Sequence, residues 1–193
     1  MAAAELTPAL RQSARRWLPP GLPATWLHAY AAIWIATLAP AAIVALVGQP
    51  LARPARRLLA LALTAQRNPQ PHVGHVLALA AHNIPIASWP LLLGVLGAHR
   101  HRLATHVADG VLLTCIVVNT LPVGAALGAY GGAVLPYLPH LPLEWGGLAL
   151  GASAWLAQRR QALTISEGIG LFLLIACVLL CAAVLESVGV PHR

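Results

Sequence analysis

The strongest constraint on this chain is a series of apolar runs, most of them long enough to cross a lipid bilayer. A transmembrane helix needs about 20 predominantly apolar residues. The runs cover 26–47, 74–98, 107–134, 141–157 and 167–188, the fourth being the shortest. Turn residues and charges close them, as in Gly48-Gln49-Pro50 after the first run and Gln158-Arg159-Arg160 after the fourth. The pattern predicts an all-α, polytopic transmembrane helical bundle of about five spans.

The composition excludes an ordinary soluble domain. Of the 193 residues, 59% are hydrophobic and 9% are charged, and the mean hydropathy is +0.74. Soluble domains carry roughly a quarter charged residues, so lipid must cover most of the outer surface here. We expect residues 1–25 to form a cytoplasmic tail and residues 26–190 to form a single transmembrane domain. The first run is too long for the core of a cleavable signal peptide, which indicates an uncleaved first helix.

The basic residues accompany the apolar runs. All twelve are arginine, and the formal charge is +7. Short arginine runs beside apolar segments are typical of membrane topology and anionic headgroups, so we expect a lipid bilayer and no nucleic acid as partner. In segment 51–67, arginines recur at helical spacing while the leucines lie largely off that stripe; they are Arg53, Arg56, Arg57 and Arg67. This predicts a basic amphipathic helix at the membrane surface, with a sixth, re-entrant segment as the alternative.

The distribution of arginine also bears on orientation. With five spans and the N-terminus inside, seven arginines lie on the cytoplasmic side and five on the outer side. The connection 136–142 contains none, as expected of an outer loop. The positive-inside rule therefore favours an N-terminus inside and a C-terminus outside the cytoplasmic (inner) membrane.

Small residues at four-residue spacing mark the later spans. Lipid gives helices little hydrophobic drive to associate, and small-xxx-small faces allow close backbone contact. The glycines with this spacing are Gly124, Gly128, Gly132, Gly147 and Gly151. They predict tight helix packing within the chain, and homo-oligomerisation is a further possibility.

The acidic residues are few, and two of them have an ordinary explanation. Asp109 and Glu167 fall near the expected starts of the third and fifth spans, where the helix dipole favours negative charge. Glu144 is different, because it follows Pro139-His140 by four residues at the start of the fourth span. One interpretation is a structural corner in which a carboxylate pairs with His140. The other is a proton-handling or metal-binding pair, because ionisable groups inside a membrane are costly and often functional.

Further polar residues lie within the spans. His82-Asn83 is inside the second span, Asn119 inside the third and Glu186 near the far end of the last. Intramembrane asparagines typically bond across to another helix. The set predicted as a functional polar cluster is His82, Asn83, His140, Glu144 and Glu186. Its ligand types would serve zinc, but no H-E-x-x-H helix is present, and we expect no metal, no cofactor and no catalytic residues.

The order of these motifs resembles the stage II sporulation protein M family of membrane proteins. Ala81-His82-Asn83-Ile84 comes first, then the glycine-containing run 92–97, then Pro139-His140 with Glu144, and finally Glu186 before Pro191. The family typically has an Asn-Asn pair, a glycine-containing span, Pro-His-Gly-x-x-Glu and a terminal Ala-x-x-x-Glu run before Thr-Pro. The resemblance covers residues 75–191. His82, Leu141 and Val190 depart from the family pattern, so the chain resembles a divergent member.

The resemblance implies a non-enzymatic role. The named member of the family is similar to a membrane scaffold for cell-wall hydrolases, and other members look like accessories to ABC transporters. We therefore expect a scaffold or transport accessory that organises membrane partners. A small proton- or ion-coupled transporter using the His140–Glu144 corner is the alternative, and an intramembrane metal hydrolase is a third hypothesis.

Overall fold

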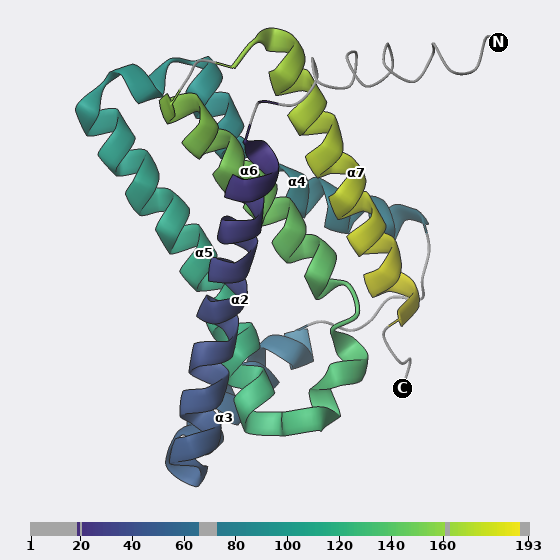
Figure 1. The fold of residues 1–193 in the computed structure, drawn as a ribbon. Helices are drawn as coiled ribbons and strands as arrows, with labels where there is room; N and C mark the ends of the chain where they lie inside the picture. The colour runs from purple at the N-terminus through teal and green to yellow at the C-terminus, as the bar shows by residue number, and fades with distance from the viewer. Residues whose placement is uncertain (1–18, 20, 66–72, 161–162, 190–193) are drawn as a thin grey trace, which may run out of the picture.

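The described part of the chain is almost entirely helical. The computed structural model describes residue 19 and residues 21–65, 73–160 and 163–189, and within these ranges it contains no strand (Figure 1). The helices are α2 Leu22–Val47, α3 Gln49–Ala65, α4 Val73–Val95, α5 Arg102–Tyr130, α6 Leu141–Arg160 and α7 Ile165–Gly189, with short 3-10 helices η1 Ala98–Arg100 and η2 Gly131–Tyr137. The predicted all-α bundle is confirmed. Most of the predicted tail, 1–18, lies outside the described residues.

Four helices are long and apolar enough to cross a membrane. They are α2, α4, α5 continued into η2, and α7. In the segment formed by α5 and η2, only 11% of the most apolar 18 consecutive residues are buried within the chain. Large apolar side chains such as Leu113 and Val118 are exposed. Exposed apolar surface of this extent suits lipid contact rather than water. These helices make the chain compatible with an integral membrane protein.

The fourth predicted span, α6, differs from the other four predicted spans. It begins at Leu141, as predicted, and ends at Arg160. It is less apolar than α2, α4, α5 and α7, yet most of its residues are buried, including an unbroken stretch from Trp145 to Trp155. Neighbouring helices, rather than lipid, surround this stretch. A helix shielded in this way can be rich in glycine and alanine without exposing polar backbone to lipid.

The helices pack around α6. α2, α4 and α7 all contact it, and α5 packs mainly against α2 (Figure 1). α4 and α6 run in one direction, and α2, α5 and α7 run in the other. One end of the bundle therefore contains the start of α6 and the ends of α2, α5 and α7; we call it the His140 end. The opposite end, the Arg159 end, contains η1 and the α6–α7 connection.

Glycine permits the closest helix contacts, as the four-residue spacing predicts. A methyl group at Gly124 would overlap the Thr37 carbonyl oxygen of α2. Gly128 is equally close to α2, at the Ala41 carbonyl, and Gly151 of α6 lies against the backbone of α4. Gly147 of α6 leaves room for a leucine side chain of α7. The last glycine of the predicted set, Gly132, lies in η2, where an added methyl group would meet no atom of another helix within 4 Å, so it makes no such contact.

α3 forms where the basic amphipathic helix is predicted. Gly48, with φ of 72°, lets the chain turn out of α2 and begin α3 directly. Arg53 and Arg57 are exposed, as expected at a membrane surface, and Arg67 lies outside the described residues. Arg56, which is also exposed, reaches α5, where its Nε and Nη2 donate to the Ala129 carbonyl at 3.0 and 2.6 Å. It thereby satisfies one of the free carbonyls at the end of that helix.

Candidate functional site

The polar corner predicted around Glu144 forms at the start of α6. The His140 carbonyl accepts the Leu143 and Glu144 amides at 3.0 and 3.1 Å, so His140 caps the first turn. Residues four apart lie on one face of a helix. The His140 Nε2 and Glu144 Oε2 atoms are accordingly 3.8 Å apart, and the two side chains are only 12% and 18% exposed.

Two other helices add polar groups to this corner. Asn83 Nδ2 of α4 donates to Glu144 Oε1 at 2.8 Å. The second of these groups is the Glu186 carboxylate of α7. One possible ligand atom from each of His140, Glu144 and Glu186 lies within 4.8 Å of the other two. Burial lowers the pKa of the His140 imidazole, while the nearby Glu186 carboxylate opposes that shift. Four of the five residues predicted as a polar cluster therefore lie together in the structure, although the first and the last are about 100 residues apart in the sequence.

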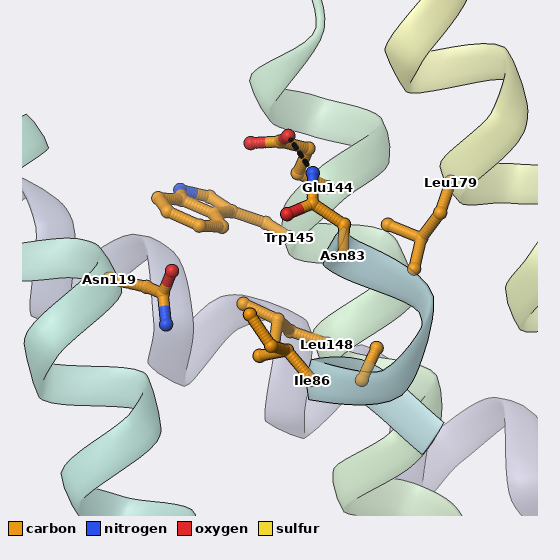
Figure 2. Close-up of a pocket in the computed structure, with 8 residues that line it drawn as sticks. Asn83, Ile86, Asn119, Glu144, Trp145, Leu148 and Leu179 are labelled. Atoms are coloured by element: carbon orange, nitrogen blue, oxygen red, sulfur yellow. Dashed lines mark hydrogen bonds between the residues drawn. The ribbon is translucent and has the colours of Figure 1, made fainter. Parts of the chain in front are cut away.

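A small cavity adjoins the corner, and Glu144 forms part of its wall. It offers about 20 Å³ for the centre of a water molecule, and about 10–15 Å³ of such space suffices for one water. Its polar wall is formed by Asn83, Asn119, Glu144 and Trp145 (Figure 2). Trp145 is 2% exposed, and its indole Nε1 is buried without a hydrogen-bond partner in the described chain. A donor in this position calls for an acceptor in the cavity.

Two of the predicted polar residues take other positions. His82 is exposed and is not part of the cluster, because successive residues on a helix point in directions about 100° apart. Asn119 lines the cavity from α5, but its amide donates to Cys115 of its own helix at 2.7 Å rather than to another helix. The cluster therefore consists of Asn83, His140, Glu144 and Glu186.

At the Arg159 end, Asp109 has a role that was not predicted from the sequence. α5 begins at Arg102, seven residues earlier, so Asp109 lies beyond the first turn where the helix dipole acts. Its Oδ1 accepts the Trp155 indole at 2.8 Å, and Arg159 Nη1 lies 2.9 Å from its Oδ2. The sequence did indicate that Trp155 and Arg159 could contact a common partner, because residues four apart lie on one face of a helix.

Gln158 is a second polar residue at this end that no sequence pattern singled out. It is 2% exposed, and its Nε2 donates to the Leu91 carbonyl of α4 at 3.2 Å. Gly94 leaves the space for it, because a methyl group there would overlap the Gln158 amide. Together with the Asp109 contacts, this bond fixes the end of α6 to α4 and α5.

The position predicted for Glu167 is confirmed. Thr164 precedes α7, and its amide and hydroxyl donate to Glu167 Oε2, each at 2.8 Å. The Glu167 amide returns a bond to the Thr164 hydroxyl at 3.3 Å. This reciprocal arrangement is a capping box, so Glu167 has a structural explanation.

The fold and the buried polar groups together define a small multi-helix protein with an apolar exterior of the membrane type. Comparison of the chain with protein-family models, with curated proteins and with solved structures finds no match.

Proposed function

We propose that the chain is a multi-pass protein of the cytoplasmic membrane, similar to stage II sporulation protein M, and acts as a non-enzymatic scaffold or transport accessory. One observation carries the proposal. Asn83, His140, Glu144 and Glu186 are among the residues on which the resemblance rests, and they meet at one site although they come from three helices. A chance likeness of scattered motifs would give no reason for this convergence.

The interior of α6 favours a scaffold over a transporter. Between the two polar ends, the buried stretch 148–154 contains one polar side chain, Ser153, whose hydroxyl donates to Ala149 of the same helix at 2.6 Å. Glycine-mediated backbone contact closes the bundle at Gly151. A proton or ion path needs a chain of polar groups or water across the membrane. Apart from Ser153, the described residues of α6 supply such groups only at its two ends.

The outer faces supply surface for partners within the membrane. Ile35 of α2, Leu113 of α5 and Leu173 of α7 are 67%, 63% and 58% exposed. With its N-terminus inside, the protein would present these faces laterally to membrane components such as an ABC transporter subunit or the membrane anchor of a cell-wall hydrolase. A second copy of the chain is a further possible partner.

Site-specific photocrosslinking in the native membrane tests the proposal. A photoreactive amino acid is placed at Ile35, Leu113 or Leu173 in turn, and the products are identified by mass spectrometry. A scaffold or accessory should give one reproducible membrane-protein product from one helix and little from the other two, which serve as matched controls. Products confined to lipid and to the protein itself, equal at all three positions, would contradict the proposal.

The ion-coupled transporter is the second candidate, favoured by the convergence of two carboxylates and an imidazole beside a cavity. Purified protein in proteoliposomes containing a pH-sensitive dye provides its test. Transport that depends on Glu144 should be lost in Glu144→Gln and retained in His82→Gln, whose side chain is exposed. The scaffold proposal predicts no flux in any of these preparations.

A further inference from the structure

Among the residues that the structure describes, the charges at the His140 end are unbalanced. Within the described residues the ion pairs are His140–Glu144 and Asp109–Arg159, so no arginine pairs with Glu144 or Glu186. The two carboxylates lie within 4.8 Å of one another and of the His140 imidazole, and all three side chains are partly buried. Like charges at this separation repel, and burial removes the water that would screen them. Either protons or a cation must balance them.

The donor set suits a transition-metal ion. Zinc binds imidazole nitrogen and carboxylate oxygen at about 2.0–2.2 Å, often with three protein ligands and one water. Two such ligands on one ion lie roughly 3.3–3.6 Å apart in tetrahedral geometry, as follows from these bond lengths. The His140 Nε2 to Glu144 Oε2 distance of 3.8 Å is close to that value. Small side-chain rotations would bring Glu186 to the same ion.

The surroundings of the three residues support such an ion. Metal-ligating carboxylates are commonly oriented by hydrogen bonds from neighbouring groups. Asn83 holds Glu144 by its Oε1, which leaves Oε2 facing His140. Independently, the buried Trp145 indole has no hydrogen-bond partner among the described residues, and it lines a cavity of water size that also borders Glu144. Figure 2 shows this indole beside the Glu144 carboxylate, where a water ligand would accept its N–H.

We propose that His140, Glu144 and Glu186 bind one divalent transition-metal ion of the zinc type, which ties the start of α6 to the end of α7. Cross-helix coordination is a strong tie in lipid, where apolar contact alone gives helices little drive to associate. The ion serves as a clasp, and it neutralises both carboxylates. This proposal does not rest on the scaffold role, because the clasp would act equally in a transporter.

Metal binding by the purified full chain tests the proposal. The protein carries an affinity tag without histidine, is stripped with chelator in detergent, and is titrated with Zn²⁺ against a fluorescent chelator and with Co²⁺ by visible absorption. We expect one ion per chain and an absorption spectrum of low-coordinate cobalt. His140→Asn, Glu144→Gln and Glu186→Gln should each weaken binding by about 100-fold or more, and Asn83→Ala by about 10-fold, in the range for loss of an orienting partner.

Matched controls separate this site from surface histidines. His82→Gln and His106→Gln change exposed side chains on α4 and α5 and should leave the affinity unchanged. Because a bound ion stabilises the folded state, Zn²⁺ should raise the unfolding temperature of the wild type and of these controls only. Glu186→Asp keeps a ligand and should retain weakened binding, which a misfolded variant could not do.

Two outcomes of these titrations would contradict the proposal. A stripped wild type that binds no Zn²⁺ or Co²⁺, or loses as much affinity through His82→Gln as through His140→Asn, would overturn the metal site. The carboxylates would then share protons instead. Neither result would affect the crosslinking pattern, so failure of the clasp and failure of the scaffold proposal are distinguishable.

Discussion

At its Arg159 end, α6 offers two hydrogen-bond donors to the Asp109 carboxylate of α5. At its His140 end, the same helix contributes a carboxylate and an imidazole that face the Glu186 carboxylate of α7. The first group pairs one negative charge with one arginine, and both side chains are more than a third exposed. The second brings together two carboxylates, which are less exposed and pair with no arginine in the described part of the chain.

The comparison distinguishes polar groups that stabilise the fold from polar groups that favour the binding of a ligand. A balanced, solvent-accessible pair has little need of a ligand, and its contribution to stability is modest. An excess of one charge in a partly buried site is costly unless something binds there. The Arg159 end therefore serves as an anchor for α6, and the His140 end is where a ligand is expected.

The largest expected effect comes from the middle of α6, on which both ends depend. In Gly151→Ala the new methyl group would overlap the Ala87 carbonyl, and backbone cannot move aside as a side chain can. We expect a loss of about 3 kcal/mol or more in the free energy of unfolding, the upper range for overpacking, measured by SDS titration in mixed micelles. Gly146→Ala is the control, because its nearest atom would be 3.9 Å away. Equal stability of the two variants would refute the close α4–α6 contact.

Removal of the acceptor at the Arg159 end should have the next largest effect. Asp109→Ala leaves the Trp155 indole, which is 1% exposed, without its partner and also removes the ion pair. An unsatisfied buried donor costs about 1–3 kcal/mol. Asp109→Asn keeps an acceptor for the indole and should lose less. Tryptophan fluorescence during the same SDS titration reports both changes, and an Asp109→Ala variant as stable as Asp109→Asn would show that the indole bond contributes little.

At the His140 end the matching change is Asn83→Ala. It removes the hydrogen bond to Glu144, and a bond to a charged acceptor contributes about 1.5 kcal/mol or somewhat more. His82→Ala, one residue away on the exposed face, should be near neutral in the same unfolding measurement. If the two variants are equally stable, the Asn83–Glu144 bond does not hold α4 to α6.

The sequence predicts the helices better than it predicts their partners. Apolar length places α6 from 141 and the amphipathic helix from 51, close to the observed starts at Leu141 and Gln49. Length cannot reveal that α6 lies in the centre, because that depends on which helices surround it. For the same reason the sequence groups His82 with Asn83, although helical rotation sends one outward and the other to Glu144.

Asp109 shows the same limit in another way. Its predicted role depends on the start of α5, and a helix beginning five residues before the predicted span at 107 removes the dipole explanation. The true partners, Trp155 and Arg159, lie about 50 residues further along the chain. The His140–Glu144 pair is predictable because it is local, at i and i+4, whereas the approach of Glu186 depends on the packing of α7.

The smallest expected effect sharpens the contrast between the two ends. Arg159→Gln removes the charge partner of Asp109 but leaves the Trp155 bond in place. Because Arg159 is 40% exposed, we expect a loss below about 1 kcal/mol in the free energy of unfolding, and a smaller one at high salt, which screens exposed pairs. SDS titrations at low and high ionic strength measure both. A large, salt-independent loss would mean that the Arg159 end is as poorly hydrated as the His140 end, and that its ion pair is buried in the membrane.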